Sequence, residues 1–100
     1  MVIKGTVVKI IHLNENMSNL ILRKKEKGSY VTICFLAFEE QKRIIHQLNV
    51  IAGDGVKITA HIFSKKYNEK YYTSIVIDKL VITNKKTDLS MVDLTTGELL

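Results

Sequence analysis

The stretch GVKITAHIFSKKYNEKYYTSIVIDKLVI, residues 55–82, decides the fold of this chain. It predicts two long strands, residues 55–63 and 71–82, joined by a turn over residues 64–70. One side of the first strand is apolar and consists of Val56, Ile58, Ala60 and Ile62. The other side carries Lys57, Thr59, His61 and Phe63. This alternation with a period of two predicts that the first set faces a core and the second faces solvent.

The predicted turn is basic and carries an aromatic ring. It holds Lys65, Lys66, Lys70 and Tyr67, and it directly follows Phe63. Lysines neutralise phosphates and flat rings stack on unpaired bases, so these residues predict a nucleic-acid surface. An ordinary half-buried hairpin with a solvated lysine tip fits the same pattern.

Composition and charge narrow the class of protein. One hundred residues make one domain, and 46% hydrophobic with 25% charged residues is typical of a soluble globular protein. The formal net charge of +5 predicts a polyanionic partner.

The longest apolar runs are far shorter than the roughly 20 residues of a membrane span, and no signal-peptide pattern opens the chain, so we expect no membrane partner. The single Cys34 cannot form an internal disulfide, which fits a cytoplasmic protein, and we expect it to be a small core residue.

Three strands and one helix are predicted ahead of this hairpin. The strands are residues 1–13, 17–25 and 30–38, and the helix is residues 39–51, where Ile44, Ile45, Leu48 and Ile51 recur at helical spacing. The first strand has apolar residues on both faces, which indicates a strand that is covered on both sides or that covers a partner subunit. Gly5 within it indicates a bulge or a sharp bend.

The order of these elements predicts an all-β fold. A five-stranded barrel with one helix between the third and fourth strands is the order of the OB-fold. Strand spacing alone also allows an SH3-like barrel or an α+β sheet. Residues 1–83 form the predicted OB-fold domain, and residues 84–100 form a C-terminal tail without sustained periodicity. The tail has two lysines and three acidic residues, so the basic character belongs to the domain.

The stretch over residues 32–82 resembles the bacterial and phage single-stranded DNA-binding proteins of the SSB family. The similar motifs are TICF (residues 32–35), GVKITA (55–60), KKYN (65–68) and YYTSIVI (71–77). The hairpin between the second and third strands is shorter than is usual in that family, and the chain has no Trp and no acidic C-terminal tip. It therefore resembles a short form, either of a phage or mobile-element type or similar to the primosomal replication protein.

The resemblance implies sequence-independent binding of single-stranded DNA in replication, recombination and repair. It also implies a homodimer or homotetramer, with replication proteins as further partners. The stacking rings of the family match Tyr67, after the fourth strand, and Phe35, at the end of the third, and another falls near Tyr30.

The predicted binding residues combine the residue pattern with the resemblance. The aromatic ones are Tyr67, Phe35, Phe63, Tyr30 and Tyr72, and the basic ones are Lys24, Lys25, Lys57, Lys65, Lys66 and Lys70. In an OB-fold the two lysine-rich tips flank one binding face, which is a stronger signal than a single run of charge. Without the resemblance, Phe35 is interpreted as core, Tyr72 as a cross-strand packing residue and the lysines as solvated tips.

The residue pattern predicts a protein that is not an enzyme. His12, His46 and His61 have no carboxylate at motif spacing, and no metal-binding or phosphate-loop motif occurs in the sequence, so we expect neither metal nor cofactor. Two alternatives stay open. One is a protein-interaction OB module that pairs through its first strand and apolar tail, and the other is an RNA-binding OB domain.

Overall fold

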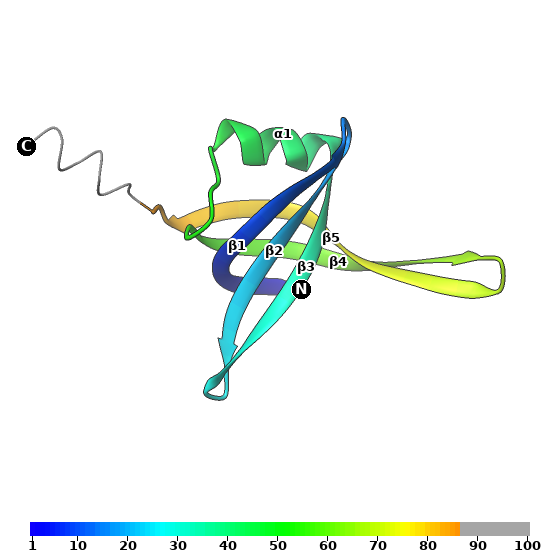
Figure 1. Cartoon of the computed structure of the whole chain (residues 1–100), viewed down its shortest axis with the longest axis horizontal. Helices are drawn as coiled ribbons and strands as arrows, with labels where there is room; N and C mark the ends of the chain where they lie inside the picture. The colour runs from blue at the N-terminus through cyan, green and yellow to red at the C-terminus, as the bar shows by residue number, and fades with distance from the viewer. Residues whose placement is uncertain (87–100) are drawn as a thin grey trace, which may run out of the picture.

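The computed structural model describes residues 1–86, and five strands and one helix account for most of them (Figure 1). The elements are β1 (Val2–Asn14), β2 (Met17–Glu26), β3 (Ser29–Phe38), α1 (Glu39–Gln47), β4 (Gly55–Tyr67) and β5 (Lys70–Asn84). The strands pair in the order β1-β2-β3-β5-β4 and close into a barrel. The pairing is antiparallel except between β3 and β5, where Leu36 pairs with Val76 in parallel. The predicted five-stranded OB-fold with one helix between β3 and β4 is confirmed.

The core lies inside the barrel and beneath α1. Its buried apolar residues are Val7, Leu20, Leu22, Phe35, Ala37, Ile45, Val50, Val56, Ile58, Ala60, Ile77 and Leu80. Of the residues in α1 itself only Ile45 is buried, so the helix closes one end of the barrel with a narrow apolar stripe.

The helix is shorter than the predicted span of residues 39–51. It ends at Gln47, because Asn49 adopts a left-handed conformation (φ 52°) that helices do not continue through. The N–H of Val50 donates to the carbonyl of Ile45 (3.1 Å), which directs Val50 into the core. Leu48 and Ile51, predicted on the apolar face of the helix, are therefore exposed.

Strand β1 serves two parts of the barrel. Thr6 pairs with Gly55 of β4 on one side and with Arg23 of β2 on the other, so the strand changes partner there. A Cβ on the adjacent Gly5 would lie 2.6 Å from the carbonyl oxygen of Arg23, which explains a residue without a side chain at this crossing. The register shifts of β1 fall between Val7 and Lys9 and between His12 and Asn14, so the bulge predicted at Gly5 does not lie at that residue.

A buried carboxylate fastens the end of β5 to the loop that follows α1. Asp54 is fully buried, and its Oδ2 accepts hydrogen bonds from the N–H of Ile51 (2.9 Å) and the Nζ of Lys85 (2.7 Å). Its Oδ1 accepts one from the N–H of Lys86 (2.8 Å). The sequence predicts only a turn here, so this contact between distant segments was missed.

The β4–β5 hairpin is longer than predicted. Both strands continue past the barrel as a two-stranded arm, residues 62–75, which projects from the body of the protein (Figure 1). The turn is confined to Asn68 and Glu69, which have φ of 49° and 66°. The prediction of a turn over residues 64–70 is therefore wrong for residues 64–67 and for residue 70, which are strand. Ile62, predicted to face the core, is 60% exposed because the arm leaves the barrel at this point.

Two further expectations concern membranes and the tail. Within residues 1–86, no helix has the length and apolar character that crossing a membrane requires. Strand β5 ends at Asn84, one residue beyond the predicted domain boundary, and residues 87–100 of the predicted tail lie outside the described part of the chain.

Candidate nucleic-acid interface

The pairing of the arm sorts its side chains onto two faces. Residues that pair directly across an antiparallel ladder lie on the same face, and the next pair lies on the opposite face. One face, called here the stacking face, is formed by the pairs Phe63 with Ser74, Lys65 with Tyr72, and Tyr67 with Lys70. It thus brings together five of the predicted binding residues: Phe63, Lys65, Tyr67, Lys70 and Tyr72.

The three rings of the stacking face are accessible. Phe63 is 50%, Tyr67 61% and Tyr72 56% exposed. Tyr72 lies diagonally between the other two across the ladder, at the roughly 7–8 Å expected for diagonal neighbours. Packing against the core does not explain three large, half-exposed rings beside two lysines.

On the other face of the arm, the side chains contact one another. The Nζ of Lys66 lies 5.9 Å from the ring centroid of Tyr71 and 3.7 Å from a carboxylate oxygen of Glu69. The hydroxyls of Ser64 and Thr73 are hydrogen bonded at 2.8 Å. Lys66 was predicted to bind alongside Tyr67, and the structure places the two on opposite faces of the ribbon.

The β2–β3 hairpin carries a second aromatic and basic pair. Lys25 pairs with Tyr30, which is 63% exposed, and the guanidinium of Arg23 lies over the same ring at 4.9 Å from its centroid. Lys24 is on the opposite face, and its Nζ lies 3.8 Å from a carboxylate oxygen of Glu26. The structure therefore adds Arg23 to the predicted set. The sequence signal for it is that Arg23 and Lys25 are two residues apart on one strand.

Lys57 belongs to a basic area on the outer surface of the barrel. It pairs with Lys4 of β1, although the two residues are 53 positions apart in the sequence. Two like charges directly opposite each other repel, so an anion between them is favourable. Lys79 of β5 is also exposed and pairs with Thr59, and no predicted binding motif includes it.

Phe35 is not available as a stacking residue in this structure. It is fully buried in the core, where it pairs with Leu20 on the inward face of β3. Its neighbour Cys34 points the other way and is exposed. The stacking role of Phe35 and the core position of Cys34 are therefore wrong for the same reason, and the interpretation of Phe35 as a core residue from the residue pattern is confirmed. Alternation along β3 directs residue 35 into the barrel and residue 34 out of it.

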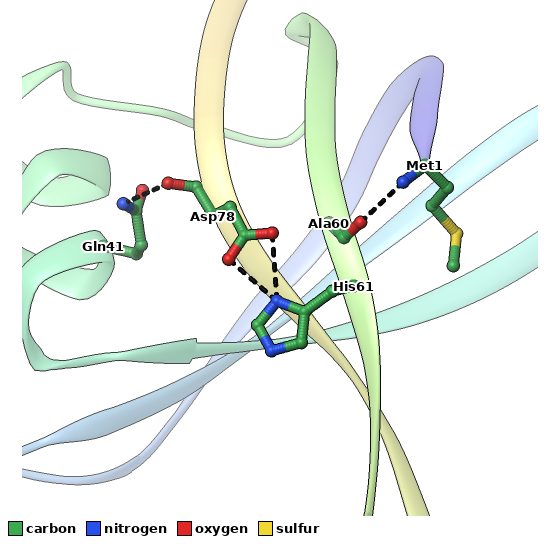
Figure 2. Close-up of polar contacts among 5 residues, drawn as sticks. All are labelled: Met1, Gln41, Ala60, His61 and Asp78. Carbon is green, nitrogen blue, oxygen red and sulfur yellow. Dashed lines mark hydrogen bonds and ion pairs between the residues drawn. The ribbon is translucent and has the colours of Figure 1, made fainter.

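An open groove of about 430 Å³ lies where the arm leaves the barrel. Phe38 and Phe63 line it, together with His61, Asp78 and the start of α1. Asp78 is the extra residue of a bulge in β5, because Thr59 pairs with Lys79 while Ala60 pairs with Ile77. Its carboxylate lies 2.8 and 2.9 Å from the Nδ1 of His61 (Figure 2). A larger groove, about 530 Å³, runs along α1 and holds none of the predicted binding residues.

Hydrogen bonds from distant segments hold the backbone on both sides of this groove. Figure 2 shows the N-terminal amino group of Met1 donating to the carbonyl of Ala60 (2.8 Å), one residue before His61. On the other side, the Nε2 of Gln41 in α1 donates to the carbonyl of Asp78 (2.7 Å). The described residues hold no group of three or more His, Cys, Asp or Glu that could bind a metal ion.

Comparison with known proteins identifies the fold. No protein-family model and no curated protein sequence matches the chain. Its structure is similar to that of Rim1, a mitochondrial single-stranded DNA-binding protein from S. cerevisiae. The TM-score is 0.67 and the identity 16%, over 88% of this chain and 96% of that chain. It is also similar to the N-terminal domain of PriB from Thermoanaerobacter tencongensis, solved as a dimer. Here the TM-score is 0.64 and the identity 19%, over 85% of this chain and 96% of that chain. At these identities the similarity establishes a shared fold.

Proposed function

We propose that this protein binds single-stranded DNA without sequence preference and serves DNA replication, recombination and repair. The observation that carries the proposal is the stacking face, where Phe63, Tyr67 and Tyr72 alternate with Lys65 and Lys70 on an exposed arm. The rings stack on successive bases while the lysines neutralise phosphates. The net charge of +5 and the fold shared with Rim1 support the same function.

The second hairpin and the barrel surface extend this interface. Tyr30, Lys25 and Arg23 offer another ring and two more cations, and Lys57 with Lys4 supplies a phosphate contact on the barrel. Figure 1 shows the two hairpins leaving the barrel in different directions, so a bound strand runs over the surface between them. In this proposal the protein is a binding protein and performs no catalysis.

We further propose that the protein works in the cytoplasm as a homodimer or homotetramer together with other replication proteins. The exposed apolar residues of β1 and the dimeric state of the similar PriB domain support self-association. The lack of a possible internal disulfide supports a reducing compartment.

Titration of a fluorescent oligo-dT of roughly thirty nucleotides tests the function directly. With about four phosphate contacts per domain, the logarithm of the association constant should fall with that of the salt concentration at a slope near −3. Duplex DNA should compete poorly, and an RNA oligomer of the same length tests the RNA-binding alternative. Absence of binding at low salt would remove the proposal.

Two tyrosines of the arm form a matched pair of variants. Tyr67→Ala removes a ring from the stacking face and should weaken oligo-dT binding by about 1–3 kcal/mol. Tyr71→Ala removes an exposed ring from the opposite face and should change binding little. Circular dichroism should show both variants folded, since both side chains lie in solvent. Equal effects of the two variants on affinity would contradict the assignment of the stacking face.

A further inference from the structure

The groove where the arm leaves the barrel combines two phenyl rings with carboxylate groups. We propose that it is a nucleobase subsite that selects bases with an exocyclic amino group, such as cytosine, over bases with a carbonyl at that position. The inference rests on the proposed function and limits its sequence independence at one position, because it places one base of the bound single strand in this groove while the other bases are bound without preference.

The apolar part of the groove suits a flat ring. Phe38, from the end of β3, is 45% exposed, and Phe63, from β4, is 50% exposed, and both line the groove. Half-exposed phenyl rings lose contact with water when a base stacks on them. Phe63 is also the innermost ring of the stacking face, so a strand that follows this face arrives at the groove.

The polar part of the groove consists of hydrogen-bond acceptors. The carboxylates of Asp78 and Glu40 line it and accept only. The Nδ1 of His61 faces the Asp78 carboxylate, and when it donates there the Nε2 of the neutral ring is an acceptor. Figure 2 shows this Nε2 on the side of the ring away from Asp78. The amide nitrogen of Gln41, a donor at this site, is already engaged by the carbonyl of Asp78.

A ligand that fits this edge must bring donors. Cytosine and adenine present an amino group, whereas thymine and uracil present a carbonyl oxygen that two carboxylates repel. A phosphate is repelled for the same reason, and the lysines that neutralise phosphates lie farther out on the arm. The groove is therefore matched to the edge of a base rather than to the backbone of the strand.

Oligo-dC and oligo-dU of about fifteen nucleotides provide the test, because they differ only at the base edge. At pH 8, where cytosine is neutral, the protein should bind oligo-dC about five- to tenfold tighter than oligo-dU. Asp78→Asn replaces an acceptor-only carboxylate with an amide and should reduce this ratio to less than about twofold.

Two more variants separate the subsite from general effects. Glu69→Gln makes the same change in net charge at the tip of the arm and should tighten binding to both oligomers while leaving their ratio unchanged. Phe38→Ala, outside the stacking face, removes a ring of the groove and should weaken the binding of oligo-dC more than that of oligo-dU, so that their ratio falls. Thermal melting establishes that each variant is folded.

The outcomes distinguish the subsite from the function. Equal, salt-sensitive binding of oligo-dC and oligo-dU by the unmodified protein would overturn the subsite and leave single-strand binding standing. The same would follow if Glu69→Gln abolished the ratio as Asp78→Asn does, because charge alone would then explain the preference. No binding to either oligomer at low salt would overturn both proposals.

Discussion

At the scale of single residues, Asp54 shows how a buried charge is tolerated in so small a protein. Burial of its carboxyl raises the pKa. The hydrogen bond from Lys85, the hydrogen bonds from the N–H groups of Ile51 and Lys86, and the charge of Lys85 lower it. These effects outweigh burial, so the pKa lies below the ordinary 3.8. The folded state therefore favours the ionised carboxylate, which joins the two residues after β5, Lys85 and Lys86, to the loop after α1.

Asp54→Ala should lower the free energy of unfolding by about 2–4 kcal/mol at neutral pH. The substitution leaves two backbone N–H groups without an acceptor and removes a charged hydrogen bond. Urea denaturation measures the change. Because the folded pKa is depressed, this stabilisation is fully present above the unfolded pKa and is lost as the pH falls through the folded pKa. The difference between the two proteins should thus be constant above about pH 5 and shrink below about pH 4. A difference that stayed constant down to pH 2.5 would contradict the ionic role.

At the scale of elements, the arm separates binding from folding. Residues 61–73 are all exposed, and the buried core ends where the arm begins. The arm therefore adds accessible rings and charge to the barrel while contributing little buried area to its stability.

Shortening the arm should abolish most DNA binding and spare the fold. Residues 65–72 are deleted and the paired residues Ser64 and Thr73 are joined by Asn-Gly, which forms a tight hairpin turn. We expect a melting temperature within a few degrees of the original and at least a tenfold loss of affinity for oligo-dT.

The shortened arm needs a control variant with the same net charge, since the deletion removes two net positive charges. Lys42→Gln with Arg43→Gln removes two from α1 and should weaken binding much less. If both proteins lost affinity equally, net charge rather than the stacking face would account for binding.

At the scale of the whole molecule, the outer surface of β1 indicates self-association. Val2 is 57%, Val8 43% and Leu13 47% exposed on this one strand, so these apolar side chains are available for contact with another chain. A second copy of the chain is the partner that we propose for it.

Sedimentation equilibrium should therefore give a mass that is a multiple of the 11.4 kDa chain at micromolar concentration. Val8→Glu places a charge in the proposed interface and should shift the protein toward the monomer, with unchanged circular dichroism because Val8 is exposed. A monomeric mass for the unmodified chain would leave β1 without this role.

Local sequence patterns predicted the elements correctly and part of the site. Alternation between residues 55 and 60 predicted the core face of β4, and the shift to helical spacing after residue 38 placed the start of α1 correctly. The same alternation puts Phe63, Lys65 and Tyr67 on one face, so much of the stacking face is implicit in the sequence. These features depend on neighbouring residues of one chain segment, whose geometry is set by the backbone alone.

Other features depend on which segments meet, and only the tertiary structure decided them. Ile62 and Ala60 follow one alternation, yet only Ala60 is buried because the barrel closes between them. Tyr72 joins the stacking face through its pairing with Lys65, and Asp78 reaches His61 through a bulge that breaks the register. The sequence by itself determined the strands, the helix and their order, since local periodicity specifies them. The length of the arm, the place of Tyr72 on the stacking face and the groove beside His61 required the tertiary structure, because pairing between distant segments determines what each face meets.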